Sequence, residues 1–379
     1  MNKKIYLSPP HMSGNEMKYI QQAFDTNWIA PLGPNVNEFE NTLQTYLGEN
    51  NFVAALNSGT AAIHLALILA GVTKEDEVLC QSFTFSASAN PIKYIGATPV
   101  FIDSEADTWN MCPKTLEAAI LDRLEKGKRP KAVIVVDSYG MPAKWDEIAA
   151  IAKKYSLFLI EDAASALGSK YKNQKCGTFG DIGIISFNGN KIITTSGGGA
   201  LVCKNAAIKE KAVFLATQAR DNAPHYEHSH IGYNYRLSNV LAGIGRGQME
   251  VLDEHIALRR AMHDFYVAYF KDIKGITVFT EPNTDYFSNH WLTAILVNPE
   301  QTGGKTREDL SLALDKANIE CRPLWKPMHL QPIFANDPYY GDTLSESLFK
   351  NGLCLPSGSN LEDEAKNRIQ VALDFFFKG

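Results

Sequence analysis

The sequence predicts an α/β fold: a large domain with a mainly parallel seven-stranded sheet, followed by a smaller α+β domain. Two observations lead to this prediction. Over the first 250 residues, short apolar, β-branched runs alternate with longer segments of helical periodicity, as in parallel sheets whose strands are joined by helices. Beyond residue 250 the strand signals weaken and amphipathic stretches dominate. We therefore place the large domain at residues 1–248 and the small domain at 249–379.

The seven expected strands lie in the large domain, at residues 52–55, 77–80, 97–102, 132–137, 158–161, 182–187 and 200–203. Segment 61–70 is apolar almost all round and predicts a buried helix, whereas 113–125 and 145–154 alternate apolar and charged residues at helical spacing. In the small domain we expect helices at 249–272, 306–317 and 361–377, and strands at 276–279 and 291–297.

Composition and charge argue against several classes of protein. The chain has 379 residues, of which 45% are hydrophobic and 21% charged, as in an ordinary globular protein. Its net charge of -5 argues against nucleic-acid binding. Because it has neither a signal sequence nor a run of 18 apolar residues, we expect no membrane span. Six cysteines without a CxxC pair indicate reduced thiols in a cytoplasmic protein.

A polar turn follows the first expected strand. In LNSGTAAIHLAL, Ser58, Gly59 and Thr60 join this strand to the buried helix, so free backbone amides lie at a helix N-terminus at the edge of the sheet. Such an end favours an anion, and the helix dipole contributes about 0.3–1 kcal/mol per charge. Taken alone, the pattern also fits a capped helix in which Gly59 only makes the turn.

Two carboxylates end another apolar strand, in FLIEDAASALGS. Because Glu161 and Asp162 come at its carboxyl end, at least one of them should lie at the edge of the sheet. A carboxylate in that place could keep a heterocyclic nitrogen protonated. Capping of a neighbouring helix is the alternative.

A single lysine lies between a turn and three glycines in SFNGNKIITTSGGGAL. A lysine near an anion site can form a Schiff base with an aldehyde, and burial would lower its pKa enough to make the amine nucleophilic. Gly197, Gly198 and Gly199 would let the next strand pass close to a group bonded to Lys191. Phe85, in QSFTFSASAN, could lie flat over a planar ring, although core packing fits it equally well. Together the four stretches predict a pyridoxal 5′-phosphate site.

These motifs resemble those of the DegT-type sugar aminotransferases, which have the fold type I architecture of aspartate aminotransferase. The resemblance also includes NWIAPLGPNVNEFE, ATPVFID, GTFGDIGIISF, GYNYRLSNVLAGIGRGQME and RPLWKPMHLQ, and it covers essentially the whole chain. Within the family, FNGNK followed by IITTSGGG is most similar to the enzymes of the bacillosamine pathway. These enzymes aminate C4 of a UDP-linked 4-keto-6-deoxy-N-acetylglucosamine. The resemblance implies this reaction, with L-glutamate as amino donor.

The resemblance also implies roles for individual residues. Lys191 would be the Schiff-base lysine, Asp162 the partner of the pyridine nitrogen, and Phe85 the stacking ring. The implied phosphate ligands are Gly59, Thr60, Ser186 and, from the neighbouring subunit, Asn234. Because Asn234 would come from the neighbouring subunit, the resemblance implies that the active form is a homodimer.

Other positions are less well defined by the resemblance. Ser165 stands where the family usually has His or Gln near the phenolic oxygen of the cofactor, so this contact could be indirect or absent. Arg236 would be a close structural support or an interface ion pair. The candidate substrate contacts are Trp28, Tyr226, Trp325 and His329, with His228, Arg322 and Lys326 as further aromatic and basic candidates.

Several alternatives stay open. Amination at C3, or a dTDP carrier in place of UDP, fits the same family. A non-catalytic regulatory or binding protein on this fold should lack the lysine or the aspartate, and both are present. A sugar 3-dehydratase would have histidine in place of Lys191. A dinucleotide-binding oxidoreductase is disfavoured because no GxGxxG follows the first strand.

Overall fold

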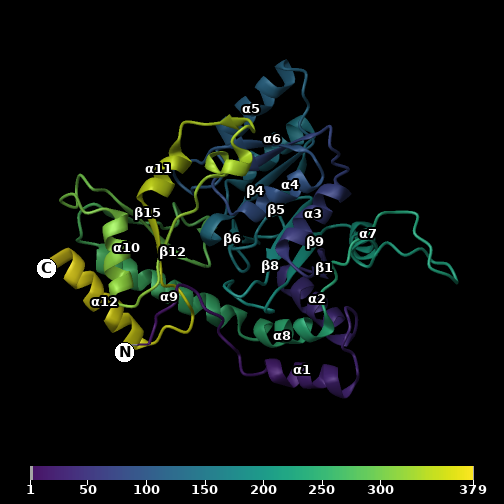
Figure 1. Cartoon of the computed structure of the whole chain (residues 1–379), viewed down its shortest axis with the longest axis horizontal. Helices are drawn as coiled ribbons and strands as arrows, with labels where there is room; N and C mark the ends of the chain where they lie inside the picture. Colours follow the sequence, from purple (N-terminus) through teal and green to yellow (C-terminus); the bar gives the residue numbers. More distant parts are fainter. Residues whose placement is uncertain (1–2, 379) are drawn as a thin grey trace.

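The computed structural model describes residues 3–378 and is built around one large sheet (Figure 1). This sheet has eight strands in the order β1-β9-β8-β5-β4-β2-β3-β14. The strands are β1 (Phe52–Leu56), β2 (Glu77–Gln81), β3 (Thr98–Ile102), β4 (Ala132–Val136), β5 (Phe158–Asp162), β8 (Ile182–Ser186), β9 (Gly199–Cys203) and β14 (Tyr339–Tyr340). Neighbouring strands are parallel except where β9 pairs with β1 and β8. The seven predicted strands are confirmed, and β14 is an eighth that the sequence did not predict.

Helices cover both faces of this sheet because residues alternate in direction along each strand. Ile134 of β4 points to the face covered by α3 (Gly59–Leu69), α4 (Asn90–Tyr94) and α7 (Ala206–Ala216). Its neighbours Val133 and Val135 point to the opposite face. That face is covered by α5 (Pro113–Glu125) and α6 (Trp145–Tyr155), and beside them by α2 (Pro34–Leu47) and α8 (Asn239–Met249). Helix α1 (Glu16–Asp25) packs on α8.

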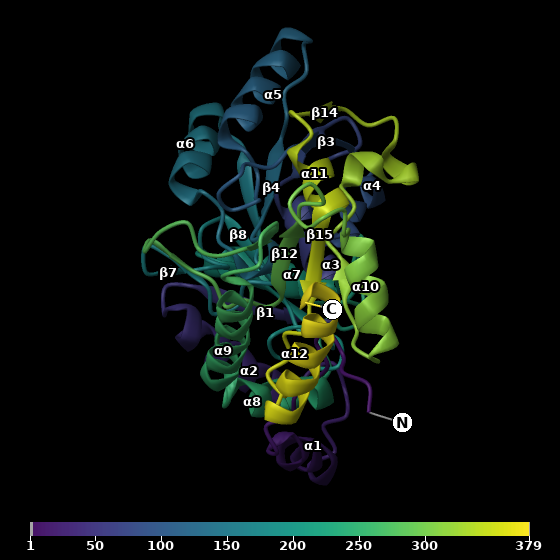
Figure 2. The ribbon, with the colours of Figure 1, turned by 90° about the vertical axis from the view of Figure 1, so that its left-hand side faces the viewer.

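A smaller antiparallel sheet forms the second part, with the order β10-β12-β15-β13. Its strands are β10 (Ile276–Val278), β12 (Thr293–Val297), β13 (Arg322–Pro323) and β15 (Gly352–Leu355). The helices of this part are α9 (Leu252–Phe270), α10 (Arg307–Lys316), α11 (Leu344–Asn351) and α12 (Asp363–Lys378). Figure 2 shows α10 and α12 in front of this sheet, with the large sheet behind it. The α+β character predicted for the C-terminal region is confirmed.

Short elements complete the chain. A three-stranded sheet has the order β11-β6-β7, formed by β6 (Lys170–Tyr171), β7 (Gln174–Lys175) and β11 (Tyr286–Phe287). Four 3₁₀ turns are η1 (Ser86–Ser88), η2 (Ser138–Gly140), η3 (Met328–Leu330) and η4 (Pro332–Phe334). No helix within residues 3–378 is both long enough and apolar enough to cross a bilayer.

Several segments connect the two parts of the molecule. Ile5 bridges to Ile319 and is buried in the core of the C-terminal part. In the other direction, β14 and β11 leave the C-terminal part and pair with β3 and β6. The division at residue 248 stays a prediction. Ile5, β14 and β11 each pack or pair with the other part of the molecule, so the two parts are closely joined.

Candidate active site

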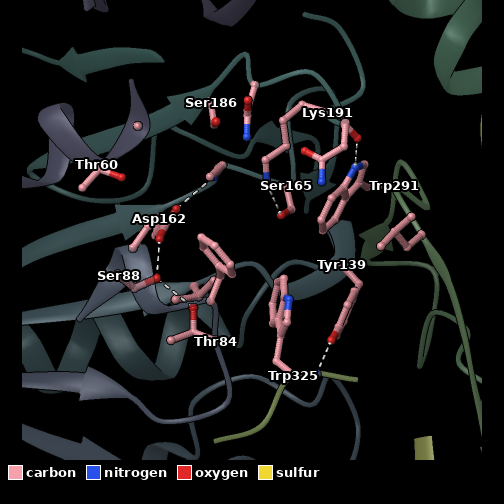
Figure 3. Close-up of a pocket in the computed structure, with 18 of the residues that line it drawn as sticks. Thr60, Thr84, Ser88, Tyr139, Asp162, Ser165, Ser186, Lys191, Trp291 and Trp325 are labelled. Carbon is pink, nitrogen blue, oxygen red and sulfur yellow. Dashed lines mark hydrogen bonds between the residues drawn. The ribbon is translucent and has the colours of Figure 1, made fainter. Parts of the chain in front are cut away.

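A cavity of about 490 Å³ lies where the carboxyl ends of the parallel strands face the C-terminal part of the chain (Figure 3). One wall comes from the large sheet, where β1, β2, β5 and β8 each end in a polar turn. The other wall comes from residues 291–292, 322–323, 325 and 354. Ligands collect at this edge of open α/β sheets, so the cavity lies where the sequence predicted a site.

The N-terminus of α3 forms one polar corner of this cavity. The Ser58 side chain accepts a hydrogen bond from the Ala61 amide at 3.0 Å, and the Ser58 carbonyl accepts one from Ala62. This cap leaves the amides of Gly59 and Thr60, the first two of the helix, for an outside acceptor. Ser186, at the end of β8, lies against Gly59 and also lines the cavity. The corner can therefore hold an anion such as a phosphate.

The glycines after Lys191 serve mainly to bring main-chain segments together. A Cβ on Gly199 would lie 2.4 Å from the Gly59 amide nitrogen, and one on Gly198 would lie 2.1 Å from the Thr195 hydroxyl. Only Gly197 has open space beside it among the three. The prediction that these glycines let β9 pass close to a group on Lys191 thus needs a refinement: Gly199 lets β9 pass close to the helix N-terminus.

Asp162 ends β5 and lines the cavity, on its left side in Figure 3. Its side chain is 4% exposed and accepts hydrogen bonds from the Ser88 hydroxyl at 2.6 Å and the Ala164 amide at 3.1 Å. Thr84 in turn lies 2.7 Å from the Ser88 hydroxyl. Burial raises the pKa of Asp162, while Ser88, the Ala164 amide and the nearby Lys191 act in the opposite direction. A carboxylate supported in this way can accept a hydrogen bond from a protonated ring nitrogen.

Glu161 faces away from the cavity, so of the two adjacent carboxylates only Asp162 lies at the site. It accepts hydrogen bonds from the amides of Gly177 and Phe179, and burial raises its pKa to about 7. Asp137 and Cys176 lie beside it, all three fully buried. Burial and the neighbouring Glu161 raise the pKa of Asp137 well above its ordinary range, so this acid pair shares a proton. Glu161 has a structural role in holding residues 177–179.

Lys191 projects into the cavity from the turn after β8. Its Nζ donates to the Ser165 hydroxyl at 3.2 Å and lies 4.1 Å from the centre of the Trp291 ring. Burial lowers the pKa of Lys191 to about 8, although the charge on Asp162 acts to raise it. A lysine with this pKa is partly neutral near physiological pH and can act as a nucleophile or a base.

The far end of the cavity is aromatic, and most of it was missed in the sequence. Tyr139 stacks on Trp325 with ring centroids 4.3 Å apart, and its hydroxyl accepts a hydrogen bond from the Trp325 amide at 2.9 Å. Tyr139 adopts a left-handed conformation (φ 56°) inside η2, a feature that no sequence pattern revealed. Trp291 completes the wall beside Lys191. Arg322, among the weaker candidates, also lines the cavity.

The structure brings most of the predicted residues together. The predicted residues that line the cavity are Gly59, Thr60, Phe85, Asp162, Ser165, Ser186, Lys191 and Trp325. Phe85 keeps 60% of its side chain exposed, so its ring is accessible from the cavity side. Ser165, the departure from the usual family pattern, directly contacts the Lys191 amine.

Four predicted residues, Trp28, Tyr226, Asn234 and His329, do not line this cavity, and neither do the further candidates His228 and Lys326. His329 pairs with the Ser82 hydroxyl at 2.7 Å and stacks on Tyr339, so it joins the 328–330 turn to the end of β2. Tyr226 is 81% exposed in the segment after α7, which projects from the body in Figure 1. The Asn234 side chain is exposed, while its carbonyl accepts from Asn57 on the cavity wall. The predicted contacts of these four residues stay predictions.

Comparison with known proteins identifies the family. Residues 10–374 match the model of the DegT/DnrJ/EryC1/StrS aminotransferase family. The chain belongs to this family. It is similar to EpsN of Bacillus subtilis, provisionally named a pyridoxal phosphate-dependent aminotransferase, with 54% identity over 99% of this chain and 97% of EpsN.

Two further relatives of this aminotransferase have named products. GDP-perosamine synthase of Escherichia coli O157:H7 is 35% identical over 99% of both chains. UDP-4-amino-4,6-dideoxy-N-acetyl-beta-L-altrosamine transaminase of Campylobacter jejuni is 36% identical over 78% of this chain and 77% of its own. Among solved structures, the PLP form of Spr1654 from Streptococcus pneumoniae, provisionally a sugar aminotransferase, has a TM-score of 0.89. It is 25% identical and covers 99% of both chains.

These findings confirm the predicted family and the fold type I architecture. They also confirm pyridoxal 5′-phosphate as the cofactor of such aminotransferases, and the cavity fits this group. The α3 corner offers amides and hydroxyls to a phosphate, Asp162 offers a buried carboxylate to a ring nitrogen, and Lys191 offers an amine with a lowered pKa. These groups lie in one cavity, so their residue types and positions match the phosphate, the ring nitrogen and the aldehyde of the cofactor.

Proposed function

We propose that this aminotransferase moves an amino group from L-glutamate to C4 of a nucleotide-linked 4-keto-6-deoxy sugar. The proposed acceptor is UDP-4-keto-6-deoxy-N-acetylglucosamine, and the product is UDP-4-amino-4,6-dideoxy-N-acetylglucosamine. The observation that carries the proposal is one cavity that is lined by Lys191 and Asp162 and also by an aromatic wall with Arg322. The similarity to a transaminase of UDP-linked amino sugars supports the choice of acceptor.

The polar end of the cavity holds the cofactor in this proposal. Gly59, Thr60 and Ser186 would bind its phosphate, while the ionised Asp162 would accept a hydrogen bond from its ring nitrogen and keep that nitrogen protonated. When bound, pyridoxal phosphate supplies an electron sink that stabilises negative charge at a carbon of the amino donor. Ser88 keeps Asp162 ionised and oriented, because its hydroxyl donates to one carboxylate oxygen.

Lys191 is the proton carrier. Its Nζ accepts a proton from the α-carbon of L-glutamate, and it delivers a proton to C4 of the sugar in the second half of the cycle. Ser165 orients the amine through the 3.2 Å contact with Nζ. The pKa of about 8 suits both duties, since neither the neutral nor the charged amine is rare near pH 7 to 8.

The aromatic end receives the sugar substrate. Trp325, backed by the buried rings of Tyr139 and Trp291, offers an apolar face to a sugar ring, and Arg322 offers a cation for an anionic substrate group. Leu7 and Leu292 add apolar surface near the same wall. A deoxy sugar, with a methyl group at C6, suits such a mixed surface.

We also propose a homodimer as the active form. Asn234 and the projecting segment after α7 are exposed in the single chain. Large apolar side chains of the same region are exposed as well, with Tyr226 at 81% and Ile231 at 82%. Burial of these side chains against a second copy would bring Asn234 to the phosphate corner of the neighbouring cavity.

A second acceptor is favoured by one comparison. The similarity to GDP-perosamine synthase extends over 99% of both chains, so a GDP-linked 4-keto-6-deoxy sugar is the alternative substrate. The amination at C4 and the roles of Lys191 and Asp162 would be the same. The two proposals differ in the nucleotide carrier and at C2 of the sugar.

The experiment is a visible absorbance titration of the cofactor-loaded protein. L-Glutamate should shift the band of the bound cofactor, and the true acceptor should restore it. We expect UDP-4-keto-6-deoxy-N-acetylglucosamine to restore the band, with the GDP- and dTDP-linked 4-ketosugars and a 3-ketosugar as matched controls. Restoration by the GDP sugar alone would replace the proposed substrate by the alternative. A protein that binds pyridoxal phosphate but does not respond to L-glutamate would overturn the aminotransferase proposal.

A further inference from the structure

A buried arginine lies directly behind Lys191. Arg259, on α9, is 1% exposed, and no carboxylate within residues 3–378 forms an ion pair with it. Its guanidinium instead donates to the carbonyl of Trp291 at 2.7 Å, the carbonyl of Ser357 at 3.2 Å and the hydroxyl of Ser8 at 3.1 Å. A longer contact of 3.5 Å reaches the carbonyl of Lys191. Burial lowers the pKa of Arg259 to about 9.

An unpaired cation in this place is costly. A buried charge loses its hydration, and main-chain carbonyls return only part of that loss. An apolar side chain would fill the same space at a lower cost in folding free energy. The cost of burying Arg259 therefore indicates that its contacts hold particular groups in place.

The contacts of Arg259 converge on both peptide groups next to Lys191. The carbonyl before it, that of Asn190, accepts hydrogen bonds from the Trp291 indole at 2.6 Å and the Ser8 hydroxyl at 2.8 Å. The carbonyl after it, that of Lys191 itself, faces Arg259. Ser8 accepts from Arg259 and donates to Asn190, so its hydroxyl has partners in both directions.

Trp291 is fixed at three points. Its amide donates to the Asn289 side chain at 2.8 Å, its carbonyl accepts from Arg259, and its indole N–H donates to Asn190. The ring held by these bonds is the one that lies 4.1 Å from the Lys191 Nζ. The same small network thus sets both the main chain of Lys191 and the surface against which its amine lies.

We propose that Arg259, Ser8 and Trp291 are positioning residues for Lys191, with Arg259 as the common donor that locks the other two. The inference depends on the proposed role of Lys191 as proton carrier, and it names residues from three distant parts of the chain. Such a role needs accuracy, because a displacement of reacting groups by about 1 Å can cost on the order of 100-fold in rate. The alternative is that Arg259 only stabilises the fold.

The test measures the Lys191 amine in the full-length, cofactor-free protein, without any turnover. Acetylation of Lys191 by acetic anhydride, followed by peptide mass spectrometry as a function of pH, reports the pKa of this amine. We expect a value near 8 in the native protein. In Arg259→Gln the tether is lost and the amine reaches water, so the pKa should rise by one unit or more towards its ordinary value of 10.5.

Two variants serve as comparisons. Arg259→Lys keeps a cation that can donate to the same carbonyls, so it should restore most of the native pKa of Lys191. Arg260→Gln is the matched control. Arg260 lies next to Arg259 on α9 but pairs with Glu281 near the surface, so its loss should leave the pKa of Lys191 unchanged.

The outcomes separate a positioning role from a purely structural one. If Arg259→Gln lowers the unfolding temperature but leaves the pKa of Lys191 near 8, the proposal is wrong. Should Arg259→Gln fail to fold, Ser8→Ala and Trp291→Phe are measured in the same way, each removing one bond to the Asn190 carbonyl. A shift of a few tenths of a unit or more supports the proposal, and no shift in either overturns it. Because this measurement needs no substrate, a failure of the proposed function would appear separately in the absorbance titration.

Discussion

The two ends of the active-site cavity are built in different ways. At the polar end, each functional residue ends or follows a strand of the large sheet, as Asp162 ends β5 and Lys191 follows β8. At the aromatic end, Trp291 and Trp325 come from the C-terminal part of the chain and meet Tyr139 from the turn after β4. The difference teaches that the sheet places the groups for the common chemistry, whereas packing between the two parts of the chain shapes the space for the substrate. Variants at the two ends should therefore fail in different ways.

The largest effect is expected from Lys191→Ala at the polar end. Turnover should fall by at least about 10³-fold, because proton transfer by a positioned group alone contributes roughly 10²- to 10⁴-fold. Steady-state transamination from L-glutamate measures the loss, with Lys204→Ala as control because Lys204 is exposed just beyond β9. Near-native turnover in the Lys191 variant would contradict its assignment.

Asp162→Asn should be nearly as damaging. The amide keeps the shape of the carboxylate and can still accept from Ser88, but it cannot carry the charge that stabilises a protonated ring nitrogen. We expect a loss of about 100-fold in the L-glutamate half-reaction, a size typical of one acid or base group. Stopped-flow absorbance of the loaded variant measures this rate. An unchanged rate would contradict the proposed contact between Asp162 and the ring nitrogen.

At the aromatic end, Trp325→Ala should change substrate binding and spare the first half-reaction. Loss of the ring stacked on Tyr139 should raise KM for the ketosugar by about 10-fold or more, as expected when about 1–3 kcal/mol of ring contact is lost. The L-glutamate half-reaction should stay within about two-fold, since this end binds the sugar. Trp325→Phe keeps a ring, so its KM for the ketosugar should lie between that of the native protein and that of Trp325→Ala. An equal loss of rate in both half-reactions would contradict the proposal that Trp325 binds only the sugar.

The pH dependence of cofactor capture tests the polar end without any substrate. Only the neutral amine of Lys191 can bond to pyridoxal phosphate, and burial lowers its pKa to about 8. From pH 7 to pH 9 the neutral fraction, and with it the capture rate, should rise about 10-fold and then level off. A lysine with an ordinary pKa would show a rise of nearly 100-fold without a plateau. Stopped-flow absorbance of the cofactor-free protein distinguishes the two.

The smallest effect is expected from Ser88→Ala. This change removes the donor to one oxygen of Asp162 while the Ala164 amide keeps the other, so the carboxylate should become less acidic but stay in place. A hydrogen bond to a charged group contributes about 1.5–3 kcal/mol, part of which water in the cavity will replace. We expect a loss of about 5- to 10-fold in the L-glutamate half-reaction, which a substitution of Ser86, outside the cavity wall, should not show.

The same contrast explains how much the sequence could predict. Short local motifs identified Ser58-Gly59-Thr60, Asp162 and Lys191, because a strand end, a turn and a polar residue are all encoded within a few positions. Tyr139 could not be found in this way, since its place depends on a left-handed conformation and on stacking against Trp325. In the sequence, Arg259 is one charged residue of an amphipathic stretch, and only the fold shows that it is buried. His329, a candidate substrate contact, joins η3 to Ser82, and its contact with the substrate stays a prediction.

The fold shows the same division. Predicted strands such as 132–137 and 158–161 agree with β4 and β5 to within about a residue, because buried parallel strands are continuous apolar runs. Strand β14 has only two residues and pairs with a strand more than 200 residues away, so neither its length nor its neighbours provided a pattern. Long-range pairing of this kind becomes visible only when the parts are assembled.

Strand β14 also has a consequence for synthesis of the chain. It covers the outer edge of β3, and the Asp103 carboxylate, just after β3, accepts hydrogen bonds from the amides of Leu344 and Ser345 beyond it. While the ribosome is still adding residues 103–338, which is more than half of the protein, β3 is an open edge strand. An open edge can pair with another nascent chain, so this enzyme should depend on chaperone protection until its last tenth is made.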